Sequence, residues 1–179
     1  MDCEEAFKEA ANSNNRCGRI GERKPECGCE TESVSPDSPG PVVGSETVVR
    51  LIYSPLHVDP VTGDVTEAAF SDVKDKGLSV QREAHVTSAN IRAIGEQKRA
   101  QDAALGKKDR QFLGTVVAEV RTIREVTYDS GTRAFCVYDS ALPSLQAHAD
   151  VCQTTCSPSA MKRMRKRLRD LFQRKPKMP

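Results

Sequence analysis

"FLGTVVAEVRTIREVTYDSGTRAFCVYDS", residues 112–140, is the stretch that decides the fold expected from this sequence. In its first half the apolar residues alternate with other residues, so that Val116, Ala118 and Val120 share one face. A period of two predicts a strand with one buried side. "TYDSGT" then supplies a turn, and "RAFCVYDS" supplies a returning strand. We therefore predict a long hairpin over residues 112–140.

Other elements flank this hairpin along the chain. The β-branched run "TVVRLIYS", residues 47–54, predicts a strand that ends at Pro55. Helical spacing, capping residues and terminal glycines predict three helices, over about residues 67–76, 89–105 and 160–173. The order predicts an α+β fold: a small, mainly antiparallel sheet with a long hairpin, covered by two or three helices.

Composition and charge divide the chain into three parts. The chain has 179 residues and only 37% apolar residues, below the usual ~45–50%. Residues 1–46 carry ten acidic and five basic residues and little apolar periodicity, which predicts a disordered, acidic, cysteine-containing segment. Residues 47–156 are nearly neutral and predict one α+β domain. Residues 157–179 carry nine basic residues and one acidic residue, which predicts a basic amphipathic helix and tail.

The start of the chain and the lack of a long apolar run suggest a cytoplasmic protein, and this location guides the interpretation of the cysteines. "MDCEEAFKEA" has neither the basic nor the apolar region of a secretory signal. No apolar run approaches the ~20 residues of a membrane-spanning helix. The seven cysteines are therefore interpreted as thiols, metal ligands or redox groups before disulfides. We expect the N-terminal cysteines to be reduced and unstructured, and Cys136, in a strong strand, to be a buried inert thiol.

One candidate metal site lies in "HADVCQTTC", residues 148–156. If residues 148–152 are extended, His148, Asp150 and Cys152 leave the same face of a strand. Imidazole, carboxylate and thiolate are all suitable ligands for zinc, and Cys156 could complete a tetrahedron. The alternative is a loop in which these residues are unconnected, and no second paired-cysteine motif supports the zinc interpretation.

A candidate catalytic site arises because the pattern His-x-Asp occurs twice. His57 and Asp59 follow the first predicted strand, and His148 and Asp150 repeat the pattern. If the two strand ends meet at one sheet edge, one histidine could act as general base while an aspartate fixes its tautomer, or the four side chains could hold a metal. The alternative is ordinary turn chemistry at Asp59-Pro60.

The basic helix is a candidate binding surface. Its cationic residues are Lys162, Arg163, Arg165, Lys166, Arg167 and Arg169, set against an apolar stripe of methionine, leucine and phenylalanine. Such a helix could neutralise nucleic-acid phosphates without reading sequence. It could also lie on an acidic membrane, or insert its stripe into a partner's groove. The remaining alternative is a helix that packs its stripe on its own sheet and leaves its charges solvated.

These features favour a binding function over catalysis. We find no glycine-rich phosphate loop, nucleophile elbow or oxyanion motif. The sequence therefore favours a small binding or accessory protein that contacts nucleic acid or an acidic protein partner through residues 160–177. The alternative is a metal- or histidine-dependent enzyme built on the two His-x-Asp pairs.

Overall fold

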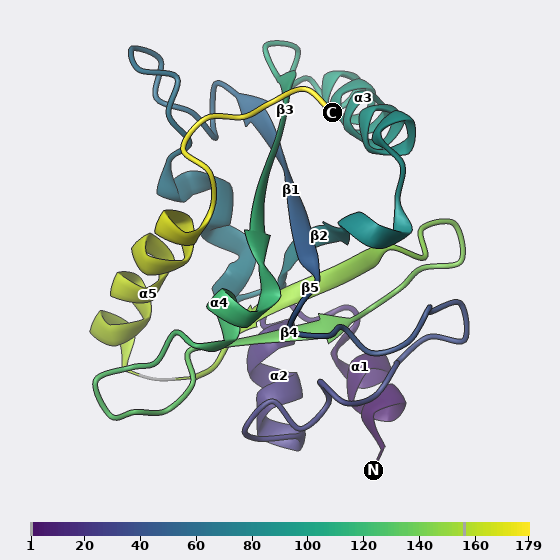
Figure 1. The fold of residues 1–179 in the computed structure, drawn as a ribbon, viewed down its shortest axis with the longest axis vertical. Coiled ribbons are helices and arrows are strands. Elements are labelled where there is room, and N and C mark those ends of the chain that lie inside the picture. The colour runs from purple at the N-terminus through teal and green to yellow at the C-terminus, as the bar shows by residue number, and fades with distance from the viewer. Residues whose placement is uncertain (1, 156) are drawn as a thin grey trace.

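The computed structural model describes residues 2–155 and 157–179 and is built around one five-stranded sheet (Figure 1). The strand order is β3-β1-β2-β5-β4, and every neighbouring pair is antiparallel. The strands are β1 (Thr47–Ser54), β2 (Leu78–Arg82), β3 (Gln111–Glu119), β4 (Phe135–Asp139) and β5 (His148–Gln153). With helices packed on this sheet, the predicted α+β class is confirmed.

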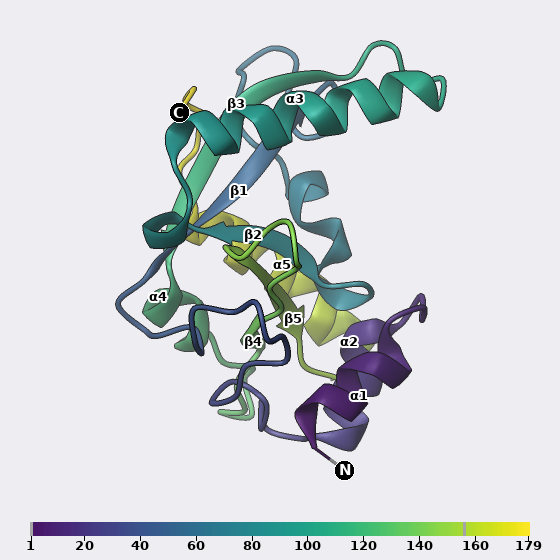
Figure 2. The same ribbon diagram turned by 90° about the vertical axis from the view of Figure 1, so that its right-hand side faces the viewer.

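The helices cover different parts of the sheet. They are α1 (Cys3–Ala10), α2 (Arg16–Arg23), the 3-10 helices η1 (Glu67–Lys74) and η2 (Glu83–His85), α3 (Ser88–Ala104), α4 (Val120–Arg124) and α5 (Pro158–Leu171). Figures 1 and 2 show α1 and α2 beside β4 and β5 at one end of the molecule and α3 beside β3 at the other. The local expectations for β1, η1, α3 and α5 are confirmed within a few residues.

The sheet is covered on both faces near β4 and β5. Ala149 and Val151 belong to the main apolar cluster, which they share with residues of η1, α4 and α5. Cys152, on the other face of the same strand, belongs to a second cluster with residues of α1 and α2. Side chains alternate between the faces of a strand. This strand therefore carries α5 on one side and the N-terminal helices on the other.

The predicted hairpin over residues 112–140 is wrong. β3 and β4 form the two opposite edges of the sheet, and β4 pairs with β5 instead. After β3 the chain turns into α4, which buries Val120 and Ile123 in the main core. These two residues are three apart, so the same apolar pattern that suggested a continuing strand also satisfies one turn of helix.

The disorder predicted for residues 1–46 is not confirmed. α1 begins with a capping box, in which Asp2 accepts from the backbone of Glu5 and the Glu5 side chain accepts from the Asp2 backbone. Phe7 of α1 packs edge-on against Tyr138 of β4, with ring centroids 5.3 Å apart. The apolar residues of this segment are few, but disulfide bonds to the sheet compensate for the small buried area.

Candidate nucleic-acid interface and cysteine-lined pocket

The helix α5 buries its apolar stripe and exposes a cationic face. Its stripe consists of Ala160, Met164 and Leu168, continued by Phe172 just beyond the helix, and all four side chains lie in the main core. The opposite face presents four exposed cations: Lys162, Arg163, Lys166 and Arg167. The pattern predicted from the sequence, with one apolar side and one basic side, is therefore realised with the apolar side facing the protein's own sheet.

The exposed cations are held only by weak surface contacts. The guanidinium of Arg163 lies 3.0 Å from the exposed carboxylate of Asp129, and the ammonium of Lys166 lies 2.7 Å from that of Asp170. Arg167 donates to the backbone carbonyl of Thr127 at 2.7 Å. Lys162 has no ion pair with any residue that the structure describes. Exposed ion pairs contribute only about 0–1 kcal/mol each, so an anionic ligand can replace them at little cost.

Two of the six predicted binding residues are less exposed than the other four and contact the protein itself. Arg169 donates from Nε to the backbone carbonyl of Val65 at 2.8 Å. Arg165 lies with its Nε 3.6 Å from the carboxylate of Glu67. Both side chains are only partly exposed and attach α5 to the chain around η1. The structure thus separates them from the four exposed cations.

The tail after α5 is attached to the rest of the molecule. Its Lys177 exchanges two backbone hydrogen bonds with Thr115 of β3, at 2.8 and 2.9 Å. Gly114 makes this approach possible, because a Cβ at that position would collide with the Lys177 carbonyl. Arg174 lies 2.8 Å from Asp64. The tail therefore adds charge beside α5 in a fixed position.

His148, Asp150 and Cys152 share one face of β5, as predicted, but they have protein partners there. One oxygen of the buried Asp150 accepts from Arg16 of α2 at 2.7 Å and from the hydroxyl of Ser140 at 2.8 Å. The Nδ1 of His148 lies 3.0 Å from both the hydroxyl and the carbonyl of Ser140. This network joins α2 to the β4–β5 pair and fixes the histidine ring.

Cys152 is bonded to Cys17 and is therefore not a thiolate ligand in this structure. The candidate ligand Cys156 lies outside the described residues. Among the residues that are described, no group of three or more His, Cys, Asp or Glu side chains is arranged to hold a metal ion. Thiolate coordination by Cys152 would first require that its disulfide be reduced.

The two His-x-Asp pairs do not meet at one sheet edge. His148 is in register with Gln81, which pairs with Val49 near the start of β1, whereas His57 follows the end of β1. The carboxylate of Asp59 accepts from the backbone of two residues that follow it, at 2.9 and 2.8 Å. This is the turn chemistry that the sequence offered as the alternative to a catalytic site.

His57 is buried and accepts a hydrogen bond through Nδ1 from the backbone N–H of Tyr53 at 3.2 Å. Its burial lowers the pKa to about 4, and the positive charges of Arg50 and Arg110 act in the same direction. The imidazole is therefore neutral in the folded protein at physiological pH, and it is unsuited to proton transfer in that range.

The low pKa of His57 predicts a loss of stability in mild acid. Between pH 6.5 and about 4 the unfolded chain binds a proton at His57 that the folded protein does not. The free energy of unfolding therefore decreases as the pH is lowered through this window. The expected loss is about 3 kcal/mol at pH 4. Urea unfolding from pH 7 to 4 measures it. The control is His57→Asn, whose amide oxygen can still accept from the backbone N–H of Tyr53 but does not titrate. If this variant lost as much stability between pH 7 and 4 as the unchanged protein, the loss could not be assigned to His57.

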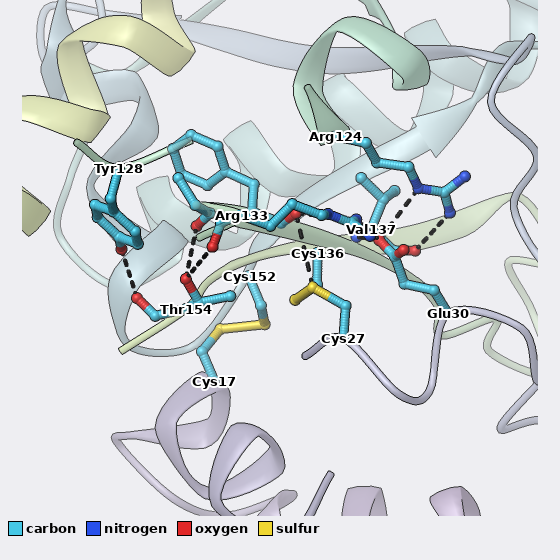
Figure 3. The surroundings of a disulfide bond; sticks show 12 residues. Cys17, Cys27, Glu30, Arg124, Tyr128, Arg133, Cys136, Val137, Cys152 and Thr154 are labelled. Carbon is cyan, nitrogen blue, oxygen red and sulfur yellow. Dashed lines mark hydrogen bonds and ion pairs between the residues drawn. A yellow bond between two sulfur atoms is a disulfide. The ribbon is translucent and has the colours of Figure 1, made fainter. Parts of the chain in front are cut away.

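Three disulfides correct the expectation of reduced cysteines. Cys3 is bonded to Cys29, Cys17 to Cys152 and Cys27 to Cys136, with Cα–Cα distances of 5.6, 5.3 and 5.3 Å. Figure 3 shows the second and third disulfides close together beneath the sheet. Cys136 is buried as predicted, but as half of a disulfide. The spacing along the chain concealed these pairs because their members lie up to 135 residues apart.

A cavity of about 690 Å³ lies beside the disulfides of Cys17 and Cys27. All four of their cysteines line it, together with Tyr138 and the turn around Gly131. A second cavity of about 550 Å³ lies between α2 and α5, and Gln153 and Thr155 line both. The exposed Lys162 of α5 also lines the second cavity. The helices α2 and α5 therefore border one hollowed region.

Comparisons of the chain with protein-family models, with curated proteins and with solved structures found no match. Within residues 2–155 and 157–179, no helix is both long enough and apolar enough to cross a membrane.

Proposed function

We propose that the protein binds nucleic acid through the exposed cationic face of α5, by contacts to the phosphate backbone. The observation that carries this proposal is the burial of the helix's apolar stripe in the main core, which leaves only its basic side exposed. A rigid helix that presents four cations on one side can neutralise several phosphates of a strand at once.

The burial of the stripe also weighs against the other ligands that the sequence allowed. An amphipathic helix that lies in a membrane interface needs its apolar face to enter the lipid. A helix that docks into a protein groove uses the same face as its anchor. In α5 the corresponding side chains, Met164, Leu168 and Phe172, are at most 3% exposed. An acidic protein that contacts only the charges remains the second class of partner.

Direct reading of base sequence is not part of the proposal. The four exposed side chains are lysines and arginines, and the aromatic Phe172 is buried. Bases are recognised by stacking on exposed aromatic rings or by groove contacts, whereas phosphate contacts fix position without specifying sequence. We therefore expect similar affinity for unrelated sequences of equal length.

The disulfides bear on where such binding takes place. Three disulfides join six of the seven cysteines. Disulfides persist in oxidising compartments and are rare in the cytosol. The cysteine pairing therefore favours an oxidising environment over the cytoplasmic location suggested by the sequence.

The enzyme alternative receives less support. It needs His57 and His148 near one point, but the strand register places them toward opposite ends of β1. The carboxylate of Asp150 already accepts hydrogen bonds from Arg16 and Ser140. A general base requires an accessible lone pair, so these contacts favour a structural role for the second pair.

Neutralising the exposed face of α5 tests the proposal. We expect the variant Lys162→Gln, Arg163→Gln, Lys166→Gln, Arg167→Gln to lose at least about tenfold in affinity for duplex DNA of mixed sequence at low salt. The dependence of log affinity on log salt should fall in slope by about one for each phosphate contact removed. Fluorescence anisotropy with a labelled duplex of about 20 base pairs, between about 50 and 200 mM salt, measures both quantities.

A matched variant controls for net charge. Lys8→Gln, Arg19→Gln, Arg23→Gln, Lys108→Gln also removes four exposed cations, but from α1, α2 and the loop after α3. Equal losses in the two variants would show that only the overall charge matters and would contradict an interface on α5. Deleting residues 157–179 is unsuitable, because it would also remove Leu168 and Phe172 from the core.

A further inference from the structure

The cysteines of the β4–β5 pair lie directly opposite each other. Cys136 on β4 is the register partner of Cys152 on β5. Opposite residues of an antiparallel pair have Cα atoms about 4.5–5.5 Å apart. A disulfide requires about 4.4–6.8 Å. The sheet therefore holds these two cysteines within bonding range of each other, although each is bonded to a different cysteine of the N-terminal segment.

Their present partners both come from that N-terminal segment. Cys152 is bonded to Cys17 of α2, and Cys136 is bonded to Cys27 in the loop after α2. Each disulfide thus has one sulfur on the sheet and one on the segment, and the two sheet sulfurs are neighbours. Figure 3 shows the two disulfides close together under the strands. If a thiolate opens one of the two disulfides at its segment cysteine, the sheet cysteine that it releases lies opposite the sheet cysteine of the other disulfide.

The four sulfurs are next to a space that a small thiol can enter. All four cysteines line the cavity of about 690 Å³, although each residue is only 3–5% exposed. Thiol–disulfide exchange requires a thiolate to reach one of the sulfurs. The cavity supplies that access on the side of the turn at Ser130 and Gly131.

We propose that these four cysteines form a thiol–disulfide exchange site, in which a dithiol reductant converts the two segment-to-sheet disulfides into a single Cys136–Cys152 disulfide. The proposal does not depend on nucleic-acid binding by α5. Its substrate class is a dithiol, either a small molecule or a pair of cysteines in a reducing protein.

The electrons and atoms of this exchange balance. A thiolate of the dithiol attacks Sγ of Cys17, and Cys152 leaves as a thiolate. The Cys152 thiolate attacks Sγ of Cys136, which forms the new disulfide and releases Cys27 as a thiolate. The second thiol of the dithiol then displaces Cys17, so that the dithiol is oxidised to its own disulfide. One dithiol therefore supplies two electrons and two protons, and the products are the Cys136–Cys152 disulfide, the free thiols of Cys17 and Cys27, and the oxidised dithiol.

The same product forms if the other disulfide is attacked first. Attack at Cys27 releases Cys136 as the thiolate, which attacks Cys152 and releases Cys17. In both routes the cysteine on the sheet is the internal nucleophile, and the N-terminal segment loses its disulfide bonds to the sheet. The Cys3–Cys29 disulfide remains, because both of its members belong to the segment. Exchange thereby replaces two bonds between segment and sheet by one bond within the sheet.

Variants that lack one segment cysteine test the internal step without any reductant. In Cys17→Ser, Cys156→Ser the residue Cys152 is left as a free thiol beside the Cys27–Cys136 disulfide. Incubation near pH 8, acid quenching and alkylation should place the label on Cys27, with Cys136 and Cys152 joined. In the mirror variant Cys27→Ser, Cys156→Ser the label should appear on Cys17. Labels found only on Cys152 and only on Cys136, respectively, would overturn the proposal.

Partial reduction of the otherwise unchanged chain provides a test that needs no disulfide variant. Cys156→Ser protein is treated with one equivalent of dithiothreitol, quenched with acid and alkylated. Chymotrypsin is needed with trypsin, because no lysine or arginine separates Cys136 from Cys152. The expected species has a Cys136–Cys152 link and alkylated Cys17 and Cys27. A species with one original disulfide intact and the other fully alkylated, with no new link, would contradict the exchange.

Discussion

Replacing Cys17 and Cys152 together by serine is expected to lower the free energy of unfolding by about 2–5 kcal/mol. The two residues are separated by 135 positions in the sequence, but the Cys27–Cys136 disulfide remains in this variant and already closes most of that loop, so the disulfide of Cys17 adds only a shorter loop. In the folded protein they join α2 to β5, and both are at most 4% exposed. For a chain of this size, the loss corresponds to a decrease in Tm of roughly 5–15 °C.

The Cys3–Cys29 disulfide provides the matched comparison. Its sequence separation is only 26, and both cysteines lie in the N-terminal segment. With Cys27–Cys136 in place, the additional loop that Cys17–Cys152 closes is about as long as the loop of Cys3–Cys29. Chain entropy therefore predicts a cost for Cys3→Ser, Cys29→Ser within about 0.5 kcal/mol of the first. Calorimetry of the two double variants measures the difference. Costs that differ by more than about 1 kcal/mol would show that local packing, and not the length of the closed loop, determines the contribution.

Counting thiols tests the pairing itself. Alkylation of the denatured, unreduced protein should modify at most one of the seven cysteines, whereas alkylation after reduction should modify all seven. Three or more modified cysteines without reductant would contradict the three disulfides. The fold would then have to hold residues 2–46 on the sheet by apolar and ionic contacts alone.

Local patterns in the sequence predicted the elements whose signals are local. The β-branched run over residues 47–54 became β1 with the predicted bounds. Thr87 caps α3 by accepting from the backbone of Asn90, at the start of the helix predicted over about residues 89–105. The apolar stripe of α5 follows helical spacing and is buried as such. In each case the determining contacts lie within a few residues, so a single sequence contains the necessary information.

Long-range pairing explains most of the errors. The strand signals around residues 112–119 and 135–139 were correct, but adjacency in sequence suggested a hairpin where the chain places β1, β2 and β5 between the two strands. The disulfides escaped prediction for the same reason, since six cysteines permit fifteen pairings. Residues 148–152 are extended, so His148, Asp150 and Cys152 share one face of β5 as expected for that case. The partner of Asp150 on this face comes from α2, a helix that the composition of residues 11–46 gave no reason to expect.

The salt bridges that hold the N-terminal segment were also missed. A single oxygen of the buried Glu30 accepts from Arg124 at 3.2 Å, from Arg133 at 2.7 Å and from the backbone N–H of Val137 at 2.5 Å. Figure 3 shows this carboxylate beside the Cys27–Cys136 disulfide. Glu30 lies 94 to 107 residues from these partners, so no local pattern in the sequence marks it as different from the other glutamates.

Glu30→Ala is expected to lower the free energy of unfolding by about 3–5 kcal/mol, because it leaves two partly buried guanidinium groups without their counter-charge. It also removes the acceptor of a buried backbone N–H in β4. Urea unfolding at pH 7 measures the loss. Glu30→Gln should cost less, because its amide oxygen can still accept from Val137 while the charge is absent.

Glu32→Ala is the control, since Glu32 is exposed and lies in the same segment. It should change stability by less than about 0.5 kcal/mol. We expect the loss of stability to be largest in Glu30→Ala, smaller in Glu30→Gln and smallest in Glu32→Ala. This order would show that the carboxylate of Glu30 stabilises the fold through both its charge and its hydrogen bonds. A small cost for Glu30→Ala would mean that the disulfides and the contacts of Phe7 and Arg16 hold the segment without this carboxylate. In that case the exchange of Cys17–Cys152 and Cys27–Cys136 would remove a larger part of the segment's attachment to the sheet than the loss of Glu30 does.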